Sequence, residues 1–166
     1  MHEMTERFLK EAFAGESQAS MKYQLFADRA EKEHPNVARL FRALSFAERV
    51  HATNHLRALG GIKDTVANLE TGAAGESFEI REMYPAYLAV AELQEEKHAR
   101  HSMADALEAE RVHLSLYEAA KAAVVSGSDA TVGTLQICDV CGWTVEGEAP
   151  DICPLCKARK EHFKAF

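Results

Sequence analysis

Two helical motifs in this chain place a glutamate three residues before a histidine on an otherwise apolar face. They are Glu48 with His51, in AERVHATNH, and Glu110 with His113, in EAERVHLSL. A spacing of three residues puts both side chains on one face of a helix. Paired motifs of this kind, joined by further carboxylates from two other helices, form the ligand set of a two-iron carboxylate site inside a four-helix bundle. The two motifs therefore predict a helical domain built around such a site.

Apolar residues recur at steps of three and four over most of the chain, which is the periodicity of amphipathic helices. The pattern predicts helices over residues 4–33, 36–59, 78–95 and 98–125. Pro35 separates the first two helices, because proline lacks an N–H and restricts the residue before it. Pro85 lies inside the third helix and predicts a bend or a locally opened turn near Glu82.

Residues 61–77 contain Gly72 and Gly75 and show little periodicity, so they are expected to form a long connection. When extended, this segment would reach about 56 Å, whereas the second helix is about 36 Å long. Such a connection could run the length of the bundle and allow the second and third helices to be parallel. The predicted fold is therefore mainly α, with a ferritin-like antiparallel four-helix bundle that has one long crossover.

Three glutamates interrupt apolar helical faces, namely Glu16, Glu48 and Glu110. A glutamate on a helix is usually solvated, but an unpaired buried carboxylate costs on the order of several kcal/mol. Carboxylates on inward faces therefore need cations. In an antiparallel hairpin, residues equally distant from the turn lie at one level, which pairs Glu16 with Glu48 and Glu79 with Glu110. Four carboxylates are thus expected at one level of the bundle.

Glu82 follows Glu79 by three residues and is expected at the height of His51 if the second and third helices are parallel. Five carboxylates suit two ferric ions, whereas four carboxylates and an additional histidine suit two ferrous ions. A redox-dependent exchange of Glu82 for His51 is the hypothesis that follows. The predicted di-iron ligands are Glu16, Glu48, His51, Glu79, Glu82, Glu110 and His113.

All four cysteines lie near the C-terminus as two C-x-x-C pairs, Cys138 with Cys141 and Cys153 with Cys156. Two such pairs can supply four thiolates to one tetrahedral metal site, which suits zinc or iron. A zinc ribbon that only staples the fold is the structural alternative. The pattern C-x-x-C-G followed by C-P-x-C resembles that of rubredoxin and favours iron.

The cysteine-rich segment is too short to hold a core without such a staple. Trp143 and Phe163 provide the aromatic filling that a unit of this size needs. The predicted domains are residues 1–127 for the bundle, 128–134 for a linker and 135–166 for a rubredoxin-like domain.

The charge balance excludes some classes of partner. A net charge of −7 over 166 residues argues against nucleic acid and against an anionic membrane as partners. No apolar run approaches the roughly 20 residues of a membrane span, and the charged N-terminus does not resemble a signal peptide. Cysteines clustered in a metal site are typical of a reducing compartment. These features predict a cytoplasmic protein.

Taken in order, these motifs resemble those of the rubrerythrin family over essentially the whole chain. The matching stretches are AFAGESQAS around Glu16, FAERVHATNH around Glu48, FEIREMYPAY around Glu79 and EAERVHLSLYEAA around Glu110. The resemblance implies that the predicted ligands bind two non-haem irons and that one iron moves between Glu82 and His51 on redox change. It places the family's site tyrosines at Tyr23 and Tyr87, which would hydrogen-bond to ligand carboxylates. Core packing is the alternative role for both tyrosines.

The resemblance also implies an activity, the reduction of hydrogen peroxide to water in oxidative stress defence. Glu82, Tyr23 and Tyr87 are the expected catalytic residues, with Glu82 handling protons. Electrons would come from an NAD(P)H-dependent reductase, directly or through free rubredoxin, and pass through one iron in the four-cysteine site. The family further suggests homodimers, in which the thiolate-bound iron of one subunit lies near the di-iron site of the other. Bundle helices can be exchanged between chains in such dimers.

Two other functions stay open from the sequence alone. A ferritin-like protein that oxidises and handles iron would use the same bundle, although the attached electron-transfer domain argues against storage. A non-catalytic bundle stapled by zinc would use the same cysteines.

Overall fold

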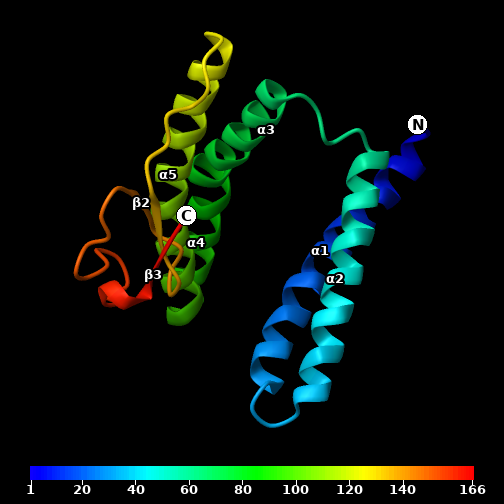
Figure 1. The fold of residues 1–166 in the computed structure, drawn as a ribbon, viewed down its shortest axis with the longest axis horizontal. Coiled ribbons are helices and arrows are strands. Elements are labelled where there is room, and N and C mark those ends of the chain that lie inside the picture. Colours follow the sequence, from blue (N-terminus) through cyan, green and yellow to red (C-terminus); the bar gives the residue numbers. More distant parts are fainter. The chain divides into compact units, whose positions relative to one another are not determined.

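The computed structural model describes residues 1–166 and divides into two compact units, Met1–Lys63 and Asp64–Phe166. Figure 1 shows the two helices of the first unit in blue to cyan, and the helices and strands of the second unit in green to red. The boundary between them does not coincide with the predicted division at residues 127–135, which stays a prediction about domains. No helix in either unit is both long enough and apolar enough to cross a membrane.

The first unit is a hairpin of two helices, α1 (Glu3–Ala30) and α2 (Pro35–Ala58). Pro35 begins α2, where its missing N–H costs no helical hydrogen bond. Small residues lie where the two helices meet. The Ser20 and Ser45 hydroxyls each donate to the backbone carbonyl of the other residue, at 2.9 and 2.8 Å. The two helices confirm the predicted ranges to within a few residues.

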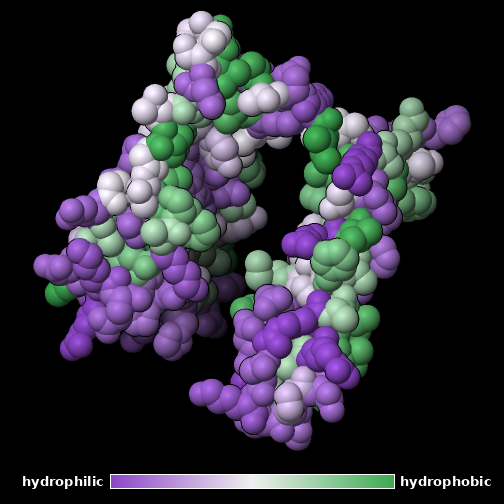
Figure 2. All heavy atoms as spheres, viewed as in Figure 1, coloured by the Kyte–Doolittle hydropathy of each residue, from purple (hydrophilic) through white to green (hydrophobic).

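Part of the hairpin surface is apolar. Leu40 and Leu44 lie on the same stripe of α2 as Glu48, and both are exposed in this chain. Phe26 on α1 is exposed as well. Figure 2 shows apolar side chains, in green, at the surface of both units. A helix face of this kind normally has a partner element that covers it.

The second unit begins with one long helix of three parts: α3 (Thr65–Phe78), a π-helical turn η1 (Glu79–Met83) and α4 (Tyr84–Leu93). The N–H of Tyr84 donates to the carbonyl of Glu79, five residues earlier, which is the hydrogen bond of a π turn. The turn confirms the predicted local opening near Glu82. It ends at Met83, two residues before Pro85, whose ring disfavours an undisturbed α-helix through the preceding turn.

The long connection predicted over residues 61–77 is wrong. Helix α3 begins at Thr65, where the Asp64 side chain caps it by accepting from the N–H of Ala67 at 2.9 Å. The segment's glycines do not break the helix. A Cβ at Gly72 would lie 3.0 Å from the ring of Tyr117, so glycine here permits close packing of α3 on α5 (Lys97–Val125). The connection shrinks to residues 59–64.

The turn between α4 and α5 contains no glycine. Glu95 adopts φ +57° at this turn. This is the left-handed region that glycine usually occupies at a helix C-terminus. The N–H of Glu96 donates to the carbonyl of Ala91 at 2.9 Å and closes the helix end. The turn is therefore made at the cost of local backbone strain.

The C-terminal part is a three-stranded antiparallel sheet in the order β2-β1-β3. Its strands are β1 (Leu135–Cys138), β2 (Thr144–Glu146) and β3 (Phe163–Ala165). The rings of Trp143 and Phe163 pack edge to face, with centroids 6.2 Å apart, which confirms them as the aromatic filling. Strand β2 contacts α5 within the same unit.

Candidate metal centres

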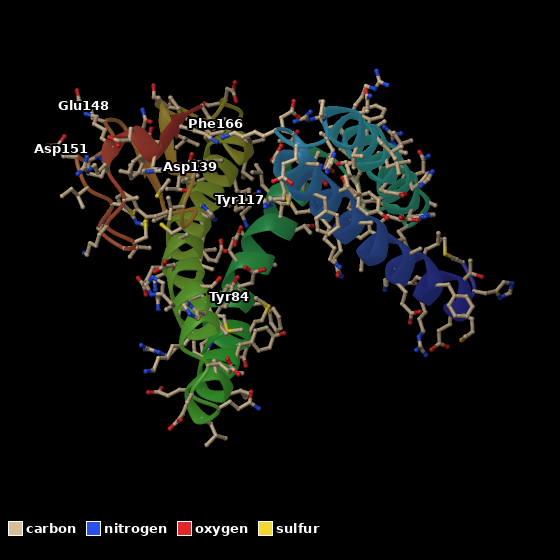
Figure 3. All side chains as sticks on the ribbon, turned by 90° about the horizontal axis from the view of Figure 1, so that it is seen from below. Tyr84, Tyr117, Asp139, Glu148, Asp151 and Phe166 are labelled. Atoms are coloured by element: carbon tan, nitrogen blue, oxygen red, sulfur yellow. The ribbon has the colours of Figure 1, made fainter.

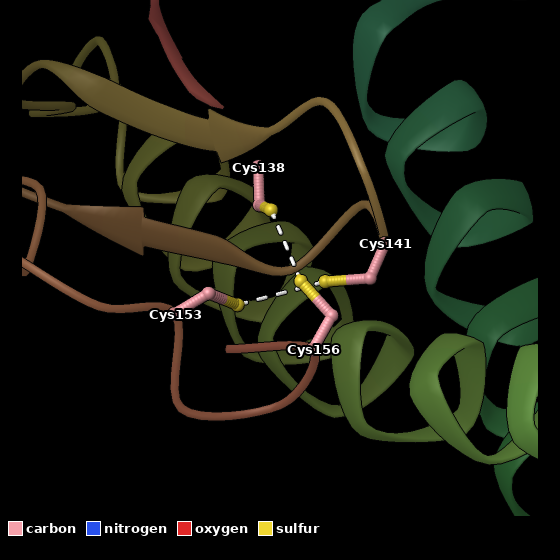
Figure 4. Close-up of side chains that lie close together, drawn as sticks. All are labelled: Cys138, Cys141, Cys153 and Cys156. Carbon is pink, nitrogen blue, oxygen red and sulfur yellow. Dashed lines mark hydrogen bonds between the residues drawn. The ribbon is translucent and has the colours of Figure 1, made fainter. Parts of the chain in front are cut away.

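The four cysteines converge, as predicted, and their sulfurs form a cage (Figure 4). The Sγ atoms of Cys138 and Cys156 lie 3.6 Å apart, as do those of Cys141 and Cys153. A disulfide would bring two sulfurs to about 2.05 Å. Four thiolates about 2.3 Å from a central metal ion stand roughly 3.8 Å apart. The cage therefore fits a tetrahedral metal ion and not two disulfides.

Two backbone knuckles hold the cage. In each knuckle the residue after the second cysteine has a positive φ and donates its N–H to the carbonyl of the first cysteine. Gly142, at φ +81°, donates to Cys138 at 2.8 Å, and Lys157, at φ +65°, donates to Cys153 at 3.1 Å. Burial raises the pKa of the Cys141 thiol. A bound cation is what such thiols need in order to ionise.

The first acidic group lies on the hairpin: Glu16 from α1 with Glu48 and His51 from α2. One ligand atom of each lies within 4.8 Å of the others. His51 Nδ1 is 2.8 Å from Oε2 of Glu48. The Glu48 side chain is 20% exposed and that of His51 54% exposed, so this predicted trio is assembled but partly open.

The second acidic group consists of Glu76 from α3 with Glu110 and His113 from α5, again within 4.8 Å. His113 Nδ1 is 2.6 Å from Oε2 of Glu110. Burial, together with the hydrogen bond and negative charge of Glu110, raises the pKa of Glu76 to about 7. Burial and the charge of Glu110 also raise the pKa of Glu79. Carboxylates this close repel one another unless a proton or a cation neutralises them, so the group fits a metal ion.

Glu76 is absent from the predicted ligand set, whereas Glu82 is in it. Glu82 is exposed and belongs to neither acidic group. Glu76 lies in the segment predicted as a connection, for which the sequence predicted no helix face. One signal was available, because Glu76 precedes Glu79 by the same three residues that separate Glu79 from Glu82. Ideal helical spacing cannot choose between these two pairs.

The structure places Tyr84, and not the predicted Tyr87, beside the carboxylates of this unit. Burial and then the charges of Glu79, Glu110 and Glu76 raise the pKa of Tyr84. Tyr87 is 50% exposed. Figure 3 labels Tyr84 on the long helix that contains the π turn. A phenol with a raised pKa stays protonated and remains a hydrogen-bond donor.

Tyr23 lies seven residues after Glu16 on α1. Its ring packs near those of Phe26 and Phe41, with centroids 6.3 and 6.0 Å away. This contact is the core-packing role that the sequence left open. A hydrogen bond from Tyr23 to a ligand carboxylate stays a prediction.

Profiles of known families match most of the chain. The profile described as "Rubrerythrin" matches residues 7–121, and the one described as "Rubrerythrin, rubredoxin-like domain" matches residues 136–164. The chain belongs to the rubrerythrin family.

Individual relatives agree with this assignment. The chain is 38% identical to Rubrerythrin-2 of Clostridium acetobutylicum, over 98% of this chain and 97% of the relative. It is 35% identical to Nigerythrin of Nitratidesulfovibrio vulgaris, over 95% of this chain and 84% of that protein. Among solved structures, the fully reduced, all-ferrous state of nigerythrin superposes with a TM-score of 0.55 and 32% identity, covering 98% of this chain and 86% of that one.

Family membership assigns the fold and the cofactors. The protein has the ferritin-like rubrerythrin fold with a C-terminal rubredoxin-like domain. Its cofactors are a di-iron carboxylate centre, for which the chain supplies the two Glu/His groups, and iron in the four-cysteine site. It is a redox protein of oxidative stress defence and works with redox partners.

Proposed function

We propose that this protein is a non-haem di-iron peroxidase that reduces hydrogen peroxide to water. The observation that carries the proposal is the presence, in one chain, of two matched Glu/His groups and a four-thiolate cage. When bound, the iron pair would supply two electrons to peroxide at once and the thiolate-bound iron would return them singly. Within the proposal, Glu76 joins the ligand set and the exposed Glu82 does not.

Protons for the reaction would come from groups beside the second acidic group. Tyr84 stays protonated there, because burial and neighbouring carboxylates raise its pKa. Its phenol O–H is thus a donor for a ligand carboxylate or for an oxygen of peroxide. Tyr23 is proposed for the same role on the side of the first acidic group. Glu82, which is exposed, is left without this role.

The two acidic groups are proposed to be halves of one di-iron centre. In a ferritin-like bundle α2 and α3 are parallel, with the ligands at one level. The end of α2 then lies about 15 Å beyond Glu48, and the start of α3 about 16 Å before Glu76. The connection would have to cover about 31 Å along the bundle axis, but residues 59–64 reach only about 25 Å.

The short connection therefore favours a dimer in which helices are exchanged. We infer that α1 and α2 of one copy pack on α3 to α5 of a second copy, so that each di-iron centre takes ligands from both chains. The apolar stripe of α2 that contains Leu40 and Leu44 would be covered by that second copy. Within the proposal, the homodimer completes each di-iron centre.

External electrons would enter at the four-cysteine site, from an NAD(P)H-dependent reductase directly or through free rubredoxin. Cys141 and Cys156 are only partly buried, which leaves the cage accessible to a donor. A transient redox partner can then approach the cage through a small interface. A reducing compartment would keep the thiols available for metal, consistent with the cytoplasm.

An anaerobic titration tests the proposed function. The protein is loaded with about three irons per chain, as the ligand sets imply, reduced, and mixed with one equivalent of peroxide per iron pair. Fast oxidation followed by return of the ferric–thiolate colour is expected. A Cys138→Ser variant should still react once with peroxide but should not be re-reduced through the thiolate iron.

Other outcomes would contradict the proposal in distinct ways. Ferric–thiolate colour without peroxide reactivity would remove the peroxidase. Oxidation of added ferrous iron by oxygen that does not depend on Cys138 would indicate an iron-handling ferritin-like protein instead. Zinc in both kinds of site would indicate a structural bundle.

A further inference from the structure

Thr144 joins the C-terminal sheet to His113 on α5. Its Oγ1 lies 2.8 Å from Nε2 of His113, and both residues belong to the unit Asp64–Phe166. Thr144 is the first residue of β2 and is only 2% exposed. Breaking the hydrogen bond of a polar side chain buried to this degree lowers the stability of the fold, because the group is left without a partner. The contact therefore holds the imidazole and the sheet in a fixed relation.

The direction of this hydrogen bond follows from the other contact of the hydroxyl. Thr144 Oγ1 also donates to the carbonyl oxygen of Gly142, at 3.2 Å. A carbonyl only accepts, and threonine has a single hydroxyl hydrogen, so the hydroxyl accepts from the Nε2–H of His113. The opposite ring atom, Nδ1, faces Oε2 of Glu110 at 2.6 Å. Nδ1 is thus the nitrogen turned toward a metal ion held by Glu110.

The Thr144 hydroxyl is also connected to the thiolate cage, through Gly142. Gly142 directly follows Cys141, and its N–H donates to the carbonyl of Cys138 at 2.8 Å. The hydrogen bond from Gly142 thus fixes the knuckle at the thiolate cage. The hydrogen bond with Thr144 fixes the imidazole of His113 on α5. Covalent bonds and two hydrogen bonds form a continuous path from Cys141, through Gly142 and Thr144, to His113.

We propose that Thr144 is a positioning residue: it fixes His113 with Nδ1 toward the metal and provides a route for single electrons between the four-cysteine site and the di-iron centre. This rests on the proposed function, because it takes His113 as an iron ligand. With iron bound in both sites, each transfer would move one electron, oxidising the thiolate-held ferrous iron and reducing one ferric iron held by the bundle. No bond forms or breaks.

The route lies within one chain. It is available because β2 contacts the chain's own α5. The approach of the thiolate-bound iron to the di-iron site of the other subunit, which the family resemblance implied, stays a prediction. A hydrogen bond from the second nitrogen of a metal-bound histidine fixes the ring orientation and the tautomer, and its removal typically weakens metal binding or activity by about 10- to 100-fold.

Nuclear magnetic resonance of the full-length protein with zinc in both kinds of site tests the positioning role. With 15N-labelled histidine, His113 should show a slowly exchanging Nε2–H proton and a metal-bound Nδ1. The signal is assigned by its loss in His113→Gln. If the unmodified protein instead shows a metal-bound Nε2 and a proton on Nδ1, the proposal is refuted. This result needs no measurement on a Thr144 variant.

Variants test the electron route. Thr144→Val keeps the shape and removes the hydroxyl, whereas Thr144→Ser keeps the hydroxyl. In Thr144→Val, the Nε2–H should exchange rapidly, and oxidation of the thiolate iron after one equivalent of peroxide should slow by about tenfold. Thr144→Ser should match the unmodified protein, and the ferric–thiolate spectrum should be unchanged in both variants.

The two proposals fail separately. If Thr144→Val matches the unmodified protein in proton exchange and in rate, the role of Thr144 is refuted. If peroxide fails to oxidise the unmodified protein, the proposed peroxidase is refuted, and the zinc-form spectra still decide whether Thr144 positions His113.

Discussion

Nδ1 of His113 lies 2.6 Å from Oε2 of Glu110, one helical turn earlier on α5. The same atoms of His51 and Glu48 are 2.8 Å apart on α2. In both motifs the imidazole leans back toward the N-terminus of its helix, as side chains on helices do, and so meets its own carboxylate. Two equivalent pairs on two helices match the symmetric ligand set of a two-metal site.

Replacing Glu76 should remove iron from the bundle, whereas replacing Glu82 should not. Glu76→Gln deletes a carboxylate from the second acidic group, and Glu82→Gln changes an exposed side chain outside it. Iron per chain, measured after anaerobic loading and desalting, should fall in Glu76→Gln and stay at the unmodified level in Glu82→Gln. The reverse result would restore Glu82 to the ligand set.

The stability of the protein without bundle metal should depend on pH through Glu76. Its pKa is raised from 4.5 to about 7 in the folded state. Between these values the folded chain holds a proton that the unfolded chain has released, so the free energy of unfolding falls as pH rises and levels off above about 7. Partial exposure of the side chain weakens the effect by solvent screening.

Urea unfolding at pH 5, 6 and 7 measures this dependence. Glu76→Gln should remove most of the slope, because the amide does not titrate. Bundle metal should also remove it, since the metal displaces the proton. A slope that is identical in the unmodified protein and in Glu76→Gln would assign the dependence to other groups.

Helix exchange should allow two defective chains to repair one site. Glu48→Gln disables the α1–α2 half and Glu110→Gln disables the α3–α5 half. In an exchanged heterodimer one centre receives both changes and the other receives none, so iron-pair content should be about half that of the unmodified dimer. Each variant alone should bind no iron pair.

The heterodimer can be purified through two different affinity tags on co-expressed chains. If each bundle forms within one chain, the heterodimer will have no intact centre. As a control, about fifteen Gly/Ser residues inserted between Gly61 and Asp64 would give the connection enough reach to close a bundle within one chain. Repair should then weaken or vanish.

Glu95→Gly should stabilise the turn between α4 and α5. Glu95 has φ +57°, and a left-handed conformation costs a non-glycine residue roughly 1 kcal/mol. The free energy of unfolding should rise by up to about that amount, less the greater freedom of glycine in the unfolded chain. Glu96→Gly is the matched control, because φ there is −81° and no strain is relieved.

The chemistry of the sites could be predicted from the sequence because it depends on local spacing. Glu48 with His51, and Glu110 with His113, needed only one helical turn each to come together. The cysteines needed only two tight knuckles. Family resemblance then supplied the fold and the cofactors, and the profile matches agree with it.

What could not be predicted depends on contacts between distant residues. Gly72 looked like a helix breaker, and only the ring of Tyr117 against it explains why a helix runs through this position. Because residues 61–77 were predicted to form a connection, Glu76 was not predicted as a ligand. The bond between Thr144 and His113 joins residues 31 positions apart, and no local pattern announces it.

The π turn at Glu79–Met83 changes how relatives of this protein should be recognised. In an ideal helix, a residue five positions after Glu79 points about 140° away from it. The additional residue in the turn brings Tyr84 back to the side of Glu76 and Glu79. The signature of this helix is therefore Glu-x-x-Glu-x-x-x-x-Tyr. A sequence pattern with regular helical spacing would place the tyrosine one residue early, at the position of Met83, and would not match this chain.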